Sequence, residues 1–155
     1  MLIIGIDPDL TASGVAVTTE RRIVAELTKV KLSGLVEFMH QQAAKVDGRI
    51  LIKMEDPNLL KPTFPRVLSH KLTPAQRTAT MRKISQDVGK VKAVTTLIME
   101  LLKDAGFNVV ACRPLVGGHK ARCKKDADYF NKLTGWEGRS NEDNRDAAMI
   151  ALFGG

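Results

Sequence analysis

The chain of 155 residues is poor in the side chains that bind soft metals or form disulfides: it has two cysteines and three histidines. Cys112 lies in an apolar run and Cys123 beside lysines, so neither a disulfide framework nor a zinc pattern is indicated. The histidines, His40, His70 and His119, are far apart and not at ligand spacing.

Long apolar runs are also absent. No segment reaches the length needed to span a bilayer, and residues 1–7 lack the basic region and cleavage site of a signal peptide. We therefore expect no membrane association and a cytoplasmic location. The composition, 44% hydrophobic and 26% charged, is that of a globular protein, and the length suits a single domain over residues 1–155.

Acidic residues are scarce in the middle of the chain. Lys and Arg number 24 against 17 Asp and Glu, a net charge of +7, but residues 61–125 hold 14 of the bases and only 3 of the acids. That segment is therefore +11 and the remainder −4. A basic middle with acidic flanks suits a protein that grips a polyanion and keeps carboxylates for another task. Charge that only maintains solubility is an equally good explanation from composition alone.

Apolar runs that end at turn residues predict five strands, over residues 2–6, 14–19, 23–27, 50–54 and 107–112. The first three are separated by short turns and should form an antiparallel meander, whereas the last two alternate with helices. We therefore expect an α/β fold with a mixed five-stranded sheet, three strands antiparallel and two parallel, with helices packed on it. In such a sheet the first and fourth strands can be parallel neighbours.

Helical spacing predicts the remaining elements. Apolar residues recur at this spacing from Leu35 to Val46 after a cap at Ser33, and residues 73–76 form a capping box that opens a long helix ending at Gly106. The apolar stripe expected along this long helix is Met81, Ile84, Val88, Val91, Ile98, Leu101 and Ala105. Gly89 within it suggests close packing against another backbone. A basic helix over 119–133 and an apolar one over 141–153 complete the chain.

Acids follow two of the expected strands and open the last helix. Asp7 and Glu55 come at the ends of strands one and four, whose carboxyl ends should meet at one edge of the sheet, where ligands usually bind. Asp143 and Asp146, three residues apart, point to the same side of the final helix. Four converging carboxylates repel one another unless a cation neutralises them. Oxygen ligands without His or Cys favour Mg²⁺ or Mn²⁺, and two such ions roughly 3.5–4 Å apart can clamp the oxygens exchanged in phosphodiester hydrolysis.

Each acid taken singly also has a purely structural explanation. Asp7 with Pro8 can start a turn, Glu55 can be a solvated strand end, and Asp143 can serve a Ser140 capping box. The set is harder to explain in that way, because its members stand in the order that the topology requires. The adjacent acids Asp9, Asp56 and Glu142 are the alternatives to the chosen residues.

Several segments resemble the RuvC family of Holliday junction resolvases, which has an RNase H-like fold. They lie along essentially the whole chain, at residues 4–8, 13–17, 55, 88–90 and 143–148. The resemblance implies an RNase H-like fold with helices on both faces of the sheet and a homodimer that nicks two opposed strands of a four-way junction during DNA recombination and repair. It also implies Mg²⁺ dependence and carries the four acids onto Asp7, Glu55, Asp143 and Asp146. The chain is compact and its 57–72 loop is rich in proline, which indicates a phage-type branch acting in the bacterial host cytoplasm.

The family also uses bases after the fifth strand, which match Lys120, with Lys124 and Lys125 as further candidates. We expect Lys120 to stabilise charge on the scissile phosphate. Bases in the middle segment should bind phosphates without reading sequence: Arg66, Lys71, Arg77, Arg82, Lys83 and Lys90. The last four should lie close to the acidic edge. Phe64 either stacks on an unpaired base at the junction or anchors its loop.

Three other functions compete with a junction endonuclease. The same fold could cut RNA or an RNA–DNA hybrid, or it could bind branched DNA without catalysis. An actin-like phosphotransferase also has an Asp after its first strand, but the Gly-rich phosphate loop that it needs does not follow Asp7. We therefore expect no nucleotide cofactor.

Overall fold

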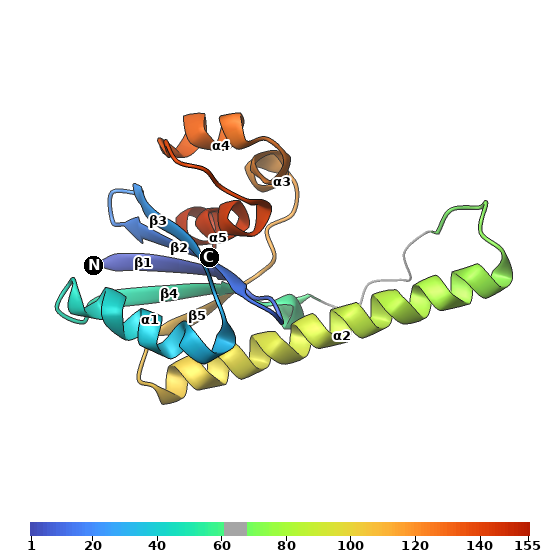
Figure 1. Cartoon of the computed structure of the whole chain (residues 1–155), viewed down its shortest axis with the longest axis horizontal. Coiled ribbons are helices and arrows are strands. Elements are labelled where there is room, and N and C mark those ends of the chain that lie inside the picture. Colours follow the sequence, from blue (N-terminus) through green and yellow to red (C-terminus); the bar gives the residue numbers. More distant parts are fainter. Residues whose placement is uncertain (61–67) are drawn as a thin grey trace.

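The computed structural model describes residues 1–60 and 68–155, and Figure 1 shows a layered α/β body from which one long helix projects. The described strands form one sheet in the order β3-β2-β1-β4-β5: β1 (Leu2–Asp7), β2 (Ser13–Thr19), β3 (Val24–Val30), β4 (Ile50–Glu55) and β5 (Val109–Cys112). The helices are α1 (Leu32–Ala44), α2 (Pro74–Asp104), α3 (Gly118–Lys125), α4 (Ala127–Thr134), α5 (Glu142–Phe153) and the short 3₁₀ helix η1 (Pro57–Leu59).

Strand pairing confirms the predicted mixed sheet. β1 pairs antiparallel with β2, and β2 with β3, whereas β4 is parallel to both β1 and β5. Ile6 lies opposite Met54, so the next residues, Asp7 and Glu55, leave the sheet side by side at its carboxyl edge. β3 runs three residues further than predicted, to Val30, and so brings Lys29 to the same edge.

Helices cover both faces of the sheet (Figure 1). On one face, α1 and the C-terminal half of α2 bury Leu35, Met39, Ile98 and Leu102 against the inward side chains of β1, β2 and β4. On the other face, α5 lies directly on the sheet, and Phe130 of α4 packs behind it. Because α5 is buried from Asn144 to Leu152, even its polar first turn is fixed in place.

The long helix α2 begins at the predicted capping box, in which Thr73 and Gln76 bond reciprocally to each other's backbone N–H groups. Only its second half packs on the sheet. The predicted stripe is therefore only partly correct: Ile98 is buried, but Val88 and Val91 are 44% and 39% exposed. The expectation for Gly89 is wrong, because nothing lies within 4 Å of where its Cβ would be.

The basic helix expected over 119–133 is two helices. Asp126 adopts an extended backbone between α3 and α4, and its side chain accepts a hydrogen bond from the Tyr129 N–H at 2.8 Å. Asp126 therefore caps the start of α4, which ends the preceding helix. Helical periodicity does not reveal this break, because α3 is almost entirely polar and buries only Cys123, so it has no apolar stripe whose end could be recognised.

The starts of α1 and α5 also differ from the predicted caps. Lys31, without a side-chain bond, precedes α1 in place of Ser33, and Asn141 rather than Ser140 caps α5 by accepting from the Asn144 N–H at 2.9 Å. The predicted contacts of Phe64 and Arg66 lie outside the described residues. Within residues 1–60 and 68–155, no helix combines the length and apolar character of a membrane span.

Candidate active site

Two glycines let α5 sit on the sheet edge where Asp7 and Glu55 emerge. A Cβ at Gly5 would lie 2.0 Å from the Ala147 carbonyl oxygen, and one at Gly14 would lie 2.4 Å from that of Asp143. Any larger residue would push the backbone of α5 away from β1 and β2. Gly5 and Gly14 therefore allow the first turn of α5, with Asp143 and Asp146, to reach the carboxyl edge of β1.

Asp7 interacts electrostatically with two of the other three predicted carboxylates, Glu55 and Asp146. Burial, followed by the negative charges of Asp146 and Glu55, raises the pKa of Asp7 to about 7, whereas Lys120 and Lys124 oppose the rise. Asp7 is therefore near half-protonation at neutral pH. Such a shift is typical of a functional site, because a structural role alone does not require carboxylates to crowd together.

Lysines neutralise the other three acids. Lys120 of α3 bonds to Glu55, and Lys124, one helical turn later, donates to Asp146 at 2.8 Å. These two lysines are four residues apart and reach the acids from the same face of α3. Their partners are shielded, with the side chains of Glu55 and Asp146 only 16% and 4% exposed.

Asp143 has its own lysine on the opposite side of the site. Lys29 of β3 donates to Asp143 at 2.6 Å in a pair that is about 40% exposed at both ends. Its pKa is raised by the hydrogen bond to Asp143 and by the charges of Asp143, Asp9 and Asp7. Four carboxylates thus share the edge with three lysines, one approaching from β3 and two from α3.

The donor set fits a hard divalent cation. It contains carboxylate oxygens and no sulfur or imidazole, which is the chemistry preferred by Mg²⁺ and Mn²⁺. One oxygen of Asp146, Oδ1, is buried and has no hydrogen-bond partner among the described residues, which leaves an acceptor available at the centre of the cluster. Among the described residues no three acidic, histidine or cysteine side chains are arranged closely enough to hold one metal ion in this conformation, in which Lys120 and Lys124 pair with Glu55 and Asp146.

The three alternative acids have local structural partners or lie outside the cluster. Asp9 accepts hydrogen bonds from the backbone of Thr11 and Ala12, which closes the turn after β1. Asp56 accepts from the Asn58 backbone and caps η1. Glu142 is exposed at the start of α5.

The predicted phosphate-binding bases divide into two groups. Lys120 and Lys124 lie at the carboxylates, and Lys125 is exposed on the same helix. The others lie on or before the projecting half of α2, where all are exposed: Lys71, Arg77, Arg82, Lys83 and Lys90. The start of α2 is the part of the helix farthest from the sheet in Figure 1, so the expectation of closeness to the acidic edge is wrong for that start. The middle of the helix does approach this edge, because Asn58 of η1, three residues after Glu55, contacts Lys92 and Thr96.

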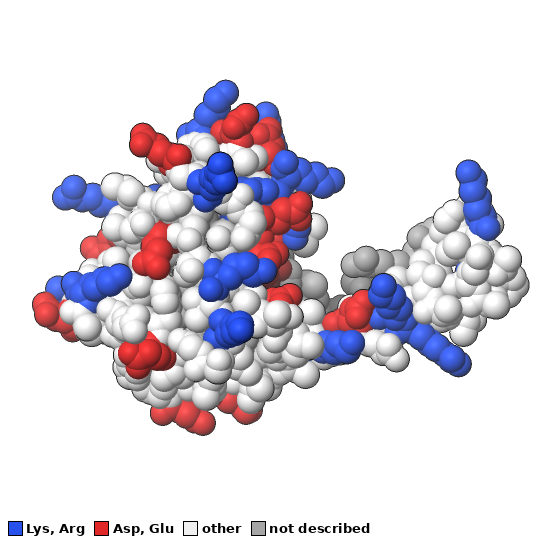
Figure 2. All heavy atoms as spheres, viewed as in Figure 1, with Lys and Arg blue, Asp and Glu red and all other residues white. Residues whose placement is uncertain are grey.

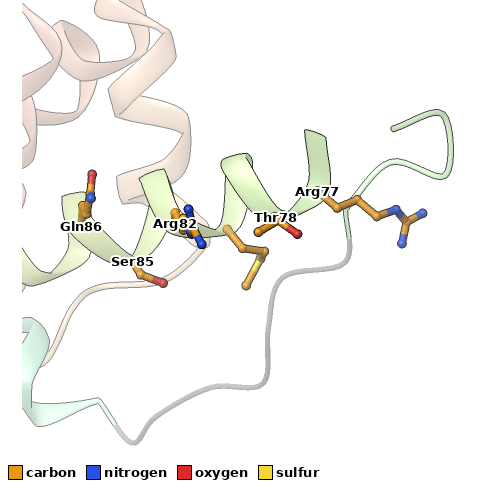
Figure 3. Close-up of a pocket in the computed structure, with 6 residues that line it drawn as sticks. Arg77, Thr78, Arg82, Ser85 and Gln86 are labelled. Carbon is orange, nitrogen blue, oxygen red and sulfur yellow. The ribbon is translucent and has the colours of Figure 1, made fainter. Parts of the chain in front are cut away.

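Basic side chains extend along the projection, as Figure 2 shows. Arg77 is held by weak bonds from its guanidinium to the carbonyl oxygens of Leu72 and Ser69. Arg77 and Arg82 also border a hollow along α2 that Figure 3 shows in close-up, with Thr78, Met81, Ser85 and Gln86 as its other lining residues. A basic arm and a carboxylate centre are therefore separate features of the molecule.

Sequence reasoning missed two residues of this region. Lys29 was missed because the third strand was expected to end at residue 27, although its place beside Asp143 follows once β3 reaches Val30. Arg145, within the acidic segment of α5, was given no role, yet it is only 6% exposed and makes four hydrogen bonds. A charged residue inside an otherwise buried helix is the signal that could have identified it.

No protein-family model matches the sequence, and no curated protein matches it. The chain is similar in structure to Thermus thermophilus RuvC in complex with a Holliday junction substrate, with a TM-score of 0.53 and 16% identity over 98% of this chain and 90% of that one. Another Thermus thermophilus RuvC structure matches with a TM-score of 0.48 and 18% identity, over 98% of this chain and 92% of that one. The fowlpox virus resolvase in complex with substrate Holliday junction DNA matches with a TM-score of 0.46 and 11% identity, over 98% of this chain and 95% of that one. The similarity to the first of these structures, together with the strand order of the sheet, shows that the chain has the RNase H-like fold of RuvC.

Proposed function

We propose that this chain is a metal-dependent endonuclease that resolves Holliday junctions or related branched DNA by paired nicking. The observation that carries the proposal is the crowding of Asp7, Glu55 and Asp146 at the carboxyl edge of β1 and β4. The fold supports it, because the similar RuvC structure holds a Holliday junction substrate. The basic segment supports it as well, since a polyanion such as DNA is bound mainly through its phosphates.

The four acids form the centre of the proposed reaction. Asp7, Glu55, Asp143 and Asp146 hold two Mg²⁺ ions per site, with Mn²⁺ as a substitute. Divalent cations, when bound, stabilise charge on the attacking and leaving oxygens of a phosphodiester. Asp7 must be ionised to act as a ligand, and the positive charge of a cation favours that ionisation against the effect of burial.

The lysines bind the DNA backbone around the reacting phosphate. Lys120 stabilises negative charge that develops on the scissile phosphate, and Lys124 and Lys29 contact phosphates on either side of it. These ammonium groups neutralise carboxylates before substrate binds, so the site stays folded although four acids share it. Lys125 and the bases of α2 extend the contact to the arms of the junction. Two further predictions from the sequence concern residues outside the described segments: Arg66 binds phosphate, and Phe64 either stacks on an unpaired base at the junction or anchors its loop.

Paired nicking requires two active sites, and each chain supplies one, so the proposed enzyme is a homodimer. Met81, Ile84, Val88 and Val91 continue the line of side chains by which the second half of α2 packs on the sheet. Val88 and Val91 are exposed on the projection. A second copy of the chain is the occupant we assign to this stripe, since an isolated projecting helix gains most of its stability from packing an apolar face.

The proposed activity is tested with a synthetic four-way junction in which each strand is labelled in turn. Wild-type protein in Mg²⁺ should nick two opposed strands, and a chelator should stop the reaction. Asp7→Asn and Asp146→Asn should each slow nicking by about a hundredfold or more while circular dichroism shows a folded protein. Asp56→Asn, which keeps the acceptor that caps η1, is the matched control and should cut at close to the wild-type rate. Wild-type rates for both active-site variants would refute the assignment.

Non-catalytic binding of branched DNA remains the alternative to this proposal. It is favoured by the lysines that stand against Glu55 and Asp146, because a site occupied by ammonium groups binds phosphate without cutting it. That function predicts tight junction binding in Mg²⁺ with no nicked product over several hours.

A further inference from the structure

Arg145 is a buried cation that pairs with no acidic side chain among the residues that the structure describes. Its Nε donates to the Cys123 carbonyl at 2.7 Å and its Nη2 to the Lys124 carbonyl at 2.6 Å. Its Nη1 donates to Ser140, to the carbonyl at 2.9 Å and to the hydroxyl at 3.2 Å. All four acceptors are neutral, although Asp146 is the next residue. A guanidinium that is buried without a carboxylate is costly, so a specific arrangement must require it.

The acceptors explain what that arrangement is. Cys123 and Lys124 belong to the last turn of α3, where carbonyl groups have no partner within the helix. Arg145 therefore caps the C-terminus of α3 from α5, and its positive charge lies at the negative end of the helix dipole. Together with Asp126, which starts α4, this cap determines that the helix ends at residue 125.

The capped helix carries both lysines of the candidate site. Lys120 reaches Glu55 and Lys124 reaches Asp146, and Arg145 bonds directly to the backbone of Lys124. The guanidinium thus fixes the backbone of α3 at Lys124 relative to the acids of α5. Its forked donors reach two successive carbonyls at once, which a lysine ammonium on a single stem cannot reproduce in the same geometry.

We propose that Arg145 is a positioning residue that docks α3 on α5 and so sets Lys120 and Lys124 on the DNA phosphate at the reacting centre. The inference rests on the proposed function, since it assigns these lysines to phosphate. Arg145 thus stands among the proposed metal ligands of α5, but its role is to position the two lysines of α3.

A double-mutant cycle on junction binding tests this role. A fluorescent four-way junction is titrated with full-length protein in chelator, so that neither metal nor nicking contributes. Removing both lysines (Lys120→Met with Lys124→Met) should weaken binding about tenfold or more, because two contacts between a charged group and phosphate are lost together. Arg145→Met alone should weaken binding to a similar extent, but should add less than twofold when the lysines are already absent.

A merely structural role predicts a different result. The loss of affinity from Arg145→Met would then be the same factor with and without the lysines, and this additivity would overturn the inference. Thermal unfolding is the internal check, since Arg145→Met should lower the melting temperature in both backgrounds. If Arg145→Met does not fold, Arg145→Lys completes the same cycle, because it keeps the charge and one bond but loses the fork.

The outcome is separable from that of the proposed function. If wild-type protein neither binds nor nicks the junction, the proposed function fails first. If wild-type protein binds and nicks while the cycle is additive, only the role of Arg145 fails.

Discussion

At the scale of single residues, the account depends most on Asp7. Burial, Asp146 and Glu55 raise the pKa of its carboxyl to about 7, well above the usual value for an aspartate. A group whose folded-state pKa is raised contributes stability below its unfolded pKa, and this contribution is lost as pH rises through the folded pKa. Between about pH 4 and pH 7 the Asp7 carboxyl is ionised in the unfolded chain but still largely protonated in the folded protein, so the folded protein should lose stability over this range.

Asp7→Asn should remove this cost, because an amide does not ionise. We expect the variant to be more stable than wild type at pH 8 by about 1–4 kcal/mol and to show little difference at pH 4. Thermal unfolding in chelator at both pH values measures the effect. The same substitution should slow nicking by about a hundredfold or more, so activity and stability should change in opposite directions, as is common at active sites. A variant less stable than wild type at pH 8 would contradict the assigned cause of the pKa shift.

Lys29 is the second residue whose role can be isolated. Its pair with Asp143 is half-exposed, and such pairs contribute at most about 1 kcal/mol to folding. Lys29→Met should therefore leave the melting temperature almost unchanged while it slows junction nicking roughly tenfold or more, since a charged contact to phosphate is lost. Lys31→Met, on an exposed lysine two residues later, is the matched control and should cut normally. Equal rates for the two variants would remove Lys29 from the site.

At the scale of secondary-structure elements, the close contact between α5 and the sheet determines where the acids lie. Gly5 and Gly14 leave no room for a side chain against the backbone of α5. Gly14→Ala should force the first turn of α5 away from β2 and cost about 1–3 kcal/mol, with a larger proportional loss of nicking because Asp143 moves with that turn. Chemical denaturation and the nicking assay measure both effects.

Gly89→Ala is the control for this substitution. Gly89 lies in the exposed half of α2 with nothing within 4 Å of its would-be Cβ, so alanine should stabilise the helix by about 0.5–1 kcal/mol without affecting catalysis. If Gly14→Ala proved as harmless as Gly89→Ala, the close approach of α5 would not be what positions Asp143.

Much of this element-level arrangement could be predicted from the sequence. Asp7 and Glu55 were placed correctly because apolar runs that end in acids mark the carboxyl ends of buried strands, and parallel pairing then brings them together. The break between α3 and α4 could not be predicted in this way. It depends on a cap supplied by Asp126 and on Arg145 from a helix some twenty residues away, neither of which affects hydrophobic periodicity.

The lysine partners of the acids were also partly beyond sequence reasoning. Lys120 was chosen through the family resemblance, but its contact with Glu55 and that of Lys124 with Asp146 depend on how α3 docks. The prediction of close packing at Gly89 is wrong for a related reason. A glycine in a helix with an apolar stripe indicates close packing only where another element covers the helix, and half of α2 is not packed on the body.

At the scale of the whole molecule, the projecting half of α2 is the feature that an isolated chain explains least well. Val88 and Val91 are exposed on it, and we assign a second copy of the chain to that stripe. The wild-type protein should be a dimer by light scattering, and Val88→Glu with Val91→Glu should shift it toward monomer. Ala93→Glu, on the opposite side of the helix by its 100° per-residue rotation, should leave the dimer intact. A wild-type monomer at micromolar concentration would contradict this assignment.

The charge of the molecule is also divided between the body, which carries the carboxylate edge, and the projecting helix, which carries bases. The net charge of +7 combines a basic segment of +11 with acidic flanks. The fold brings four acids of those flanks, Asp7, Glu55, Asp143 and Asp146, to one edge of the sheet, while α2 carries several of the bases outward. A molecule built in this way can bind the arms of a branched DNA over a wide area and confine catalysis to a small one.

The most direct test of the central claim compares substrates in one experiment. Equal concentrations of four-way junction, three-way flap, linear duplex and RNA–DNA hybrid are incubated with wild-type protein in Mg²⁺, and initial nicking rates are measured. The account predicts that the four-way junction is cut fastest, by paired nicks in opposed strands, and that Asp146→Asn cuts none of the four. Preferential cutting of the hybrid, or junction binding without any nick, would contradict it.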